Sequence, residues 1–385
     1  MDSITQTLER ALSMHQAGDL AQAESLYSEV VRRDPAHADA LHLLGVAAHQ
    51  QRRHRAAVEF ITRAIDSKSS AVYYSNLGAA YRAMGERDRA IESLQSAVRI
   101  DERLADAHYN LGTLLRECGR AAEAVDSLRQ ALELKPAFPD AWNNLGILLS
   151  ERGEHAEAIG CFRKAIEFHP QLAPAHNNLA TSLCALGRFD EAIRSYRRAL
   201  EIAPEYAEAR FNLGNAHREL DQLDDAEACY RRTLKTDPRH VAALVNLGLV
   251  CQERGELDAA IACNDRAVDI EPGHVEAHIN RSFVKRLKGN FREGFAEFEW
   301  RWKEENITPR FRGPLWDGSS LKGRSILVYA EQGVGDEIMF ASCIPDVVRQ
   351  AARCIVECDR RLIPLFGRSF PRVTCFFFSS RRRHT

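Results

Sequence analysis

The sequence predicts a mainly α-helical protein, built as a solenoid of helical hairpins and followed by a short α/β segment. Three observations lead to this prediction. A Leu-Gly step recurs at a constant spacing from Gly78 onward, a proline usually follows that glycine at a fixed distance, and the period stops near residue 291, ahead of an apolar run at 325–330. Such a period is typical of helical hairpins that each pack only on their neighbours.

Each repeat carries the same marks of a helix, a tight turn, a second helix and a stop. The steps are Leu44-Gly45, Leu77-Gly78, Leu111-Gly112, Leu145-Gly146, Leu213-Gly214 and Leu247-Gly248, with Leu179-Ala180 in the remaining place. Alanine stands twelve residues later, at Ala57, Ala90, Ala124, Ala158, Ala192, Ala226 and Ala260. Glycine and alanine remove bulk where two helices cross closely. Turn glycines such as Gly85 and Gly119 end the first helix, and prolines such as Pro136 and Pro170 end the second.

These residues resemble the tetratricopeptide repeat (TPR), most clearly in Trp142-x2-Leu145-Gly146 and Tyr74-x2-Leu77-Gly78-x2-Tyr81. The resemblance implies a right-handed TPR α-solenoid over residues 1–303, with about eight repeats. A divergent capping hairpin from His274 to about Trp302 completes it, with Ser282 in place of the glycine. Such an array can hold an extended peptide or protein in a groove.

An asparagine stands two residues before each of seven anchor positions, and the repeat places it on the first helix of each hairpin. The seven are Asn76, Asn110, Asn144, Asn178, Asn212, Asn246 and Asn280. One interpretation is a column of amides that pairs with the main chain of a bound peptide, because an amide offers an acceptor and two donors. The other is that they satisfy the neighbouring repeat or water. Both stay open, although similar columns in O-GlcNAc transferases, which this ladder resembles, hold substrate peptides.

The sequence pattern changes after the repeats. We expect a linker at 304–324, a strand at 325–330, a helix from about 337 to 353 that kinks at Pro345, a second strand at 354–358 and a weak helix at 361–366. The loop Gly333-x-Gly335-Asp336 follows the first strand, where glycines allow a ligand to approach the backbone. Its spacing matches neither a dinucleotide fingerprint nor a Walker motif, and a carboxylate there is also an ordinary helix cap.

The stretch from about Gly289 to Pro371 resembles the junction in bacterial TPR proteins that carry a heptosyltransferase-like, family 9, glycosyltransferase domain of the GT-B type. The motifs concerned include Leu315-Trp316-x-Gly318 and Ala330-Glu331-Gln332-Gly333-x-Gly335-Asp336. The resemblance implies that Asp336 acts as general base, that Gly333 and Gly335 form the acceptor or phosphate loop, and that an intact parent uses a nucleotide-sugar donor. Residues 325–375 would be the incomplete N-terminal half of that domain, and 376–385 resemble a non-native tail.

Composition limits the partners. The formal net charge of −2 favours neither nucleic acid nor an anionic membrane. No apolar run is long enough to span a bilayer and no secretory signal opens the chain, so we expect a cytoplasmic protein. The ten cysteines lack metal-ligand spacing, so we expect no metal and, for this chain, no cofactor.

The sequence therefore predicts a peptide-binding TPR scaffold that is a fragment of a glycosyltransferase and is itself catalytically inactive. The alternative is a freestanding interaction scaffold with a vestigial α/β segment. Whether any form of the chain is an enzyme stays open at this point, as does activity assembled from a complementary chain.

Overall fold

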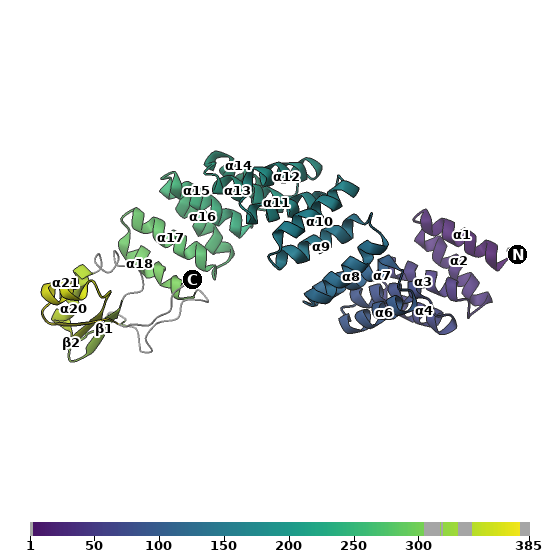
Figure 1. The fold of residues 1–385 in the computed structure, drawn as a ribbon, viewed down its shortest axis with the longest axis horizontal. Coiled ribbons are helices and arrows are strands. Elements are labelled where there is room, and N and C mark those ends of the chain that lie inside the picture. The colour runs from purple at the N-terminus through teal and green to yellow at the C-terminus, as the bar shows by residue number, and fades with distance from the viewer. Residues whose placement is uncertain (1–2, 304–315, 317–318, 330–340, 378–385) are drawn as a thin grey trace. The chain divides into compact units, whose positions relative to one another are not determined.

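The computed structural model describes residues 3–303, 316, 319–329 and 341–377 (Figure 1). The chain divides into two compact units, Met1–Ile307 and Thr308–Thr385. The first unit is helical and the second contains a small parallel sheet, as the sequence predicts.

The first unit consists, over its described residues, of consecutive antiparallel helix pairs, each packed on the next (Figure 1). The first four pairs are α1 (Ile4–Gln16) with α2 (Leu20–Arg33), α3 (Ala38–Gln50) with α4 (His54–Ser67), α5 (Ala71–Ala83) with α6 (Arg87–Ile100), and α7 (Ala105–Glu117) with α8 (Ala121–Leu134). Four more are α9 (Pro139–Glu151) with α10 (His155–Phe168), α11 (Ala173–Ala185) with α12 (Phe189–Ile202), α13 (Ala207–Glu219) with α14 (Leu223–Thr236), and α15 (Val241–Glu253) with α16 (Leu257–Ile270). The last pair is α17 (Val275–Leu287) with α18 (Phe291–Phe298), followed by the 3-10 turn η1 (Glu299–Lys303).

Helix length is constant through the array. From α1 to α17 every first helix has 13 residues, and from α2 to α16 every second helix has 14. The turn within each hairpin needs one residue with positive φ, which is a glycine in seven hairpins, as expected. In the other two it is Arg52, with φ of 62°, and Asp221, with φ of 58°. This backbone conformation is unfavourable for residues other than glycine, because the Cβ atom comes too close to the following carbonyl oxygen.

The anchor glycines lie where the two helices of a hairpin cross most closely. A Cβ atom on Gly78 would be 2.7 Å from Leu94 Cγ, and one on Gly146 would be 2.6 Å from Phe162 Cε1. The side chain sixteen residues after the glycine thus occupies the space that a larger anchor residue would need. In α16 this position is Asn264, which is fully buried. Its Nδ2 donates to the Ala260 carbonyl at 2.9 Å, whereas its Oδ1 has no partner among the described residues.

The turn between hairpins is fastened by a side chain that bonds to a carbonyl six residues earlier. Trp142 Nε1 donates to the Pro136 carbonyl at 2.8 Å, and Arg210 reaches the Pro204 carbonyl in the same way. The Nε2 atoms of His108, His176 and His278 each lie 3.0 Å from the equivalent carbonyl, so each ring must carry its proton there. The packing role that the sequence analysis favours for these histidines agrees with these bonds.

The last hairpin departs from the others. Helix α18 has eight residues, and α17 has Ser282 at the anchor position. Glu297 of α18 joins the two helices, because its carboxylate contacts Arg281, lies 2.9 Å from His278 Nδ1 and 3.1 Å from Lys285 Nζ. Its side chain is 9% exposed. Trp300 stacks on His278, with ring centroids 3.6 Å apart.

The second unit contains a three-stranded parallel sheet in the order β1-β2-β3. Its described elements are β1 (Ser325–Tyr329), the 3-10 turn η2 (Ala341–Cys343), α20 (Ile344–Gln350), β2 (Arg353–Glu357), α21 (Ile363–Ser369) and β3 (Val373–Phe376). The register pairs Ser325 with Arg353 and Cys354 with Val373. The sheet packs on Ile344 and Phe366, which are buried.

Two details of this unit differ from the sequence prediction. The expected kink at Pro345 is wrong, because Pro345 lies in the first turn of α20, where the missing amide hydrogen breaks no helical bond. The sequence analysis also has no third strand. Most of the expected linker, residues 304–315 and 317–318, lies outside the described residues, as do residues 378–385 of the expected tail.

Candidate functional site

The seven ladder asparagines lie on the first helices α5, α7, α9, α11, α13, α15 and α17, and all are half-buried. Successive members recur with the period of the repeat, so they occupy the same turn of each helix. We call the surface that carries them the ladder face.

Six of the seven amides donate a hydrogen bond to a side chain on the preceding first helix. Three use only the residue 35 positions earlier: Asn110 Nδ2 to Ser75 Oγ at 3.4 Å, Asn178 Nδ2 to Asn143 Oδ1 at 3.1 Å, and Asn212 Nδ2 to Asn177 Oδ1 at 3.4 Å. Asn144 Nδ2 lies within 3.4 Å of both Tyr109 Oη and Thr113 Oγ1. Asn246 Nδ2 donates to Asn215 Oδ1 at 2.8 Å.

The first ladder bond depends on a neutral histidine. Asn76 Nδ2 lies 2.7 Å from His42 Nε2. Burial lowers the pKa of His42 to about 4, opposed by nearby Asp39, so the ring is uncharged at neutral pH and its Nε2 can accept. His42 also stacks on Tyr73, with centroids 4.4 Å apart.

The seventh amide shows why these bonds form where they do. Five of the other ladder amides draw their acceptor from the residue 35 or 31 positions earlier, and for Asn280 these places are taken by Val245 and Leu249, neither of which can accept a hydrogen bond. Asn280 Nδ2 is buried without a partner among the described residues. Asn246 faces the same problem at Phe211, but Asn215 supplies the acceptor instead.

The ladder amides therefore link repeats, yet each keeps bonding capacity. A primary amide has two N–H donors and an oxygen with two lone pairs, and the link to the preceding repeat uses one donor, or two at Asn144. The second N–H and the oxygen are the groups that an extended main chain would pair with. Peptide binding by the seven asparagines stays a prediction.

Charged side chains lie on the first helices beside the ladder amides, and some of them are paired. At the start of the first helices Asp106 lies 3.6 Å from Lys135 Nζ, and Asp39 lies 3.9 Å from Lys68 Nζ. Near the end of α5, Arg82 pairs with Glu117 of the next repeat.

The pairing is not complete along the array. The exposed residues Asp140, Glu208 and Glu276, which are equivalent to Asp106, form no ion pair within the described residues. The charges at the start of the first helices are therefore compensated only in part.

The predicted chemistry of the second unit cannot be located. Asp336, Gly333 and Gly335 lie outside the described residues. The carboxyl edge of the sheet carries a buried carboxylate that the sequence analysis did not consider, Glu357 at the end of β2, which is 4% exposed. The sequence feature that could have identified Glu357 is its position near the carboxyl end of an expected strand.

The described residues lack two features that would indicate other functions. Within them, no three His, Cys, Asp or Glu side chains are grouped so that they could hold a metal ion. None of the described helices combines the length and apolar character needed to cross a bilayer.

Comparison with known proteins identifies the repeats. Three sequence models described as tetratricopeptide repeat match residues 137–204 and 171–239, 8–72 and 211–275, and 78–115 and 112–151. Protein FlbA of Caulobacter vibrioides is 38% identical over 91 residues, which are 22% of this chain and 15% of FlbA. The match thus spans less than a sixth of that relative.

Solved structures share the fold. The structure described as the APC/C hetero-tetramer Cut9-Hcn1 has a TM-score of 0.52 at 16% identity, over 69% of this chain and 52% of that one. The C-terminal part of a TPR repeat-containing protein from Cytophaga hutchinsonii has a TM-score of 0.50 at 17% identity, over 62% of this chain and 98% of that one. At such identities the likeness concerns the fold alone.

Proposed function

Since the chain belongs to the tetratricopeptide repeat proteins, we propose that it is a scaffold that binds an extended polypeptide along its ladder face. The observation that carries this proposal is the common orientation of the ladder amides. Six of them direct Nδ2 toward the preceding repeat, so their remaining donors and acceptors recur in the same orientation once per repeat.

The proposed ligand is read through its main chain. An amide recognises a peptide group whatever side chains flank it, so the ladder amides do not select the sequence of the ligand. Extended peptides of varied sequence should therefore bind, provided that their backbone N–H groups are free.

The test uses a peptide selected from a random library on the full chain. We expect its affinity to fall at least about tenfold when Asn144, Asn178 and Asn212 are all changed to alanine, because several hydrogen bonds are lost together. N-methylation of alternate peptide amides should have a similar effect. The matched control changes three exposed residues of the second helices in the same hairpins, Lys164, Arg197 and Arg232, to alanine.

Equal binding by the asparagine variant and the control would contradict the proposal. Circular dichroism of both variants establishes whether helix content is retained, so that unfolding is not mistaken for loss of contacts.

A second candidate function is sugar transfer in an intact parent, with this chain as the binding part. It is supported by the parallel sheet β1-β2-β3 with its helical connections and by the resemblance of the Gly333-x-Gly335-Asp336 loop to a family of glycosyltransferases. Under this proposal the chain binds an acceptor but releases no nucleoside diphosphate from a nucleotide sugar. Release that disappears with Asp336→Asn would show instead that the chain is itself an enzyme.

A further inference from the structure

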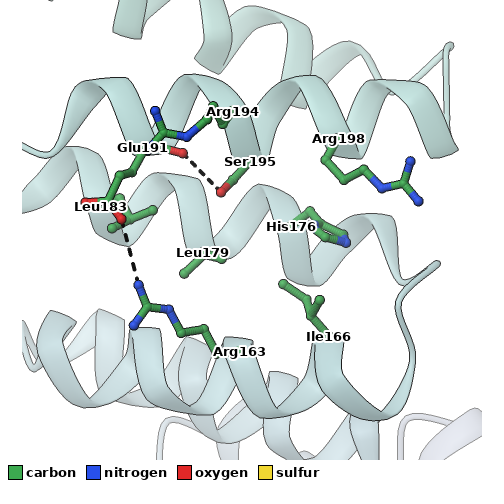
Figure 2. Close-up of a pocket in the computed structure, with 9 residues that line it drawn as sticks. All are labelled: Arg163, Ile166, His176, Leu179, Leu183, Glu191, Arg194, Ser195 and Arg198. Carbon is green, nitrogen blue, oxygen red and sulfur yellow. Dashed lines mark hydrogen bonds and ion pairs between the residues drawn. The ribbon is translucent and has the colours of Figure 1, made fainter.

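A second surface of the repeat unit, formed by the second helices, contains a pocket of about 340 Å³ (Figure 2). It lies between α10 and α12 and over α11, whereas the neighbouring ladder residue Asn178 points from α11 to α9. Its floor is apolar and its rim is cationic. We call it the arginine pocket, and define it by Ile166, Leu179 and Leu183 on the floor and Arg163, Arg194 and Arg198 on the rim.

Glu191 is the acidic residue among those that line the pocket, and it is already engaged. Its carboxylate accepts two hydrogen bonds from Arg188, at 2.7 and 2.8 Å, and Arg163 approaches it at 3.8 Å (Figure 2). Three arginines against one glutamate leave a positive rim on a chain whose total charge is close to neutral. Burial lowers the pKa of His176, so its ring adds no charge at neutral pH.

The arginines differ in how firmly they are held. Arg198 pairs with Glu201 at 2.8 Å, an exposed contact on the same helix that contributes little and can be exchanged. Arg194 is exposed and has no ion pair with any residue in the described part of the chain. Its guanidinium therefore presents donors to solvent at the edge of an apolar floor.

The repeat does not require this arrangement. The residues one repeat before and one repeat after Arg194 are Gly160 and Ala228, so an arginine here serves no common packing role. The residues equivalent to His176 are Trp142 and Arg210, which make the same bond to the turn carbonyl with larger side chains.

We propose that the arginine pocket is a second binding site, which takes an acidic segment of a partner polypeptide with one apolar side chain seated on its floor. The carboxylates on either side of that side chain pair with Arg194 and Arg198, where a planar guanidinium can bind a carboxylate through two parallel hydrogen bonds. The apolar side chain is removed from water by Leu179, Leu183 and Ile166. A partner can thus contact the second helices while a peptide lies on the ladder face.

The experiment measures fluorescence anisotropy of a labelled peptide, Asp-Glu-Asp-Leu-Glu-Asp-Glu, with the full chain. Three outcomes are expected. Binding saturates below about 1 mM, it weakens about tenfold or more in Arg194→Glu, and it weakens when the central leucine of the peptide is replaced by serine. Arg197→Glu is the matched control, because Arg197 is an exposed neighbour on α12 outside the pocket.

Several results would overturn the proposal. These are the absence of saturable binding, an equal loss in Arg194→Glu and Arg197→Glu, or indifference to the central leucine, each of which reduces the contact to general charge attraction. Displacement of the peptide by a single-stranded oligonucleotide of equal charge at equal concentration would assign the rim to nucleic acid instead. Because Arg194 is exposed, its substitution should leave the helix content unchanged, which circular dichroism checks.

Discussion

The middle of the repeat unit and its last two hairpins are both built from paired helices but are held together differently. Between residues 90 and 216 the buried side chains form one continuous apolar core. In α15 to α18 a buried amide replaces the apolar side chain at Asn264, and a valine replaces the ladder acceptor at Val245. Glu297 contacts the cationic side chains of Arg281 and Lys285 and the ring of His278. Paired helices can therefore be held together by apolar packing or by a partly buried ionic cluster. The two differ in how much stability is lost when one side chain is removed.

The sharpest contrast is expected at Glu297. Glu297→Ala should lower the stability of α17 and α18 by about 1.5–3 kcal/mol, because it removes hydrogen bonds between charged groups, while Arg281 keeps its pair with Asp265 and Lys285 keeps Glu293 nearby. The exposed Glu157, which lies 4.0 Å from Arg129, is the control, and its change to alanine should cost less than about 1 kcal/mol. Hydrogen exchange of the α17 amides measures both, since repeat arrays unfold locally. Equal protection in the two variants would contradict the comparison.

Protonation of Glu297 at low pH should weaken the same contacts, with a smaller effect than the substitution. Burial disfavours the ionised form of Glu297, yet hydrogen bonds from Arg281, His278 and Lys285 outweigh this and hold its pKa below the ordinary 4.5. A depressed folded-state pKa gives stability that is present above the unfolded value and is lost as pH falls through the folded value. We expect the protection of amides in α17 and α18, corrected for the intrinsic exchange rate at each pH, to fall below pH 4.5 before it falls in the middle of the unit. A simultaneous fall in protection throughout the unit would refute this assignment.

A substitution can give the last hairpins the apolar packing of the middle of the unit. Asn264→Leu should stabilise α15 and α16 by about 1–3 kcal/mol, because it removes a buried oxygen without a described partner and restores the contact that Leu94 makes on Gly78. The reverse change, Leu128→Asn, should destabilise α7 and α8. Thermal melting of both variants checks the pair, and a lower melting temperature for Asn264→Leu would mean that the amide has a role in the fold.

Substitutions at the turn residue within a hairpin should change stability by a smaller amount. Asp221→Gly should stabilise the α13–α14 hairpin by about 1 kcal/mol, since glycine adopts positive φ without the cost borne by a side chain. Gly187→Ala, at the same position of the preceding hairpin, should have the opposite sign. Urea denaturation of the two variants gives the comparison, which fails if both changes have the same sign.

The ladder itself should show the smallest difference. Asn178→Ala removes a hydrogen bond to Asn143 and should cost about 1 kcal/mol. Asn280→Ala removes an N–H group that has no described partner, so it should be close to neutral. A larger loss at Asn280 than at Asn178 would show that the link between repeats is not what the ladder bonds contribute.

These contrasts also mark what a sequence can predict. The hairpins follow from the constant spacing of the repeat, because glycine, alanine and proline act through backbone geometry and bulk that are the same in every copy. The placement of the asparagines on the first helices follows for the same reason. Their partners do not, since the residue 35 positions earlier changes from Ser75 to Asn143 to Val245, and valine cannot accept a hydrogen bond.

The second unit shows the limits of local patterns. The short apolar runs predicted β1 and β2, but β3 ends in an aromatic stretch without alternation, and only its pairing with β2 identifies it. The arginine pocket was likewise missed, because it is made by residues of three helices whose spacing carries no motif. Asp336, Gly333 and Gly335 lie outside the described residues, so their roles stay predictions.

The constant helix lengths have a consequence for how such a protein can change. Because an α-helix turns by about 100° per residue, inserting one residue into a first helix would rotate its ladder amide away from the column. Whole hairpins can instead be duplicated or deleted without disturbing the others, since each touches only its neighbours. The column of ladder amides can therefore lengthen or shorten only by whole hairpins, one amide at a time.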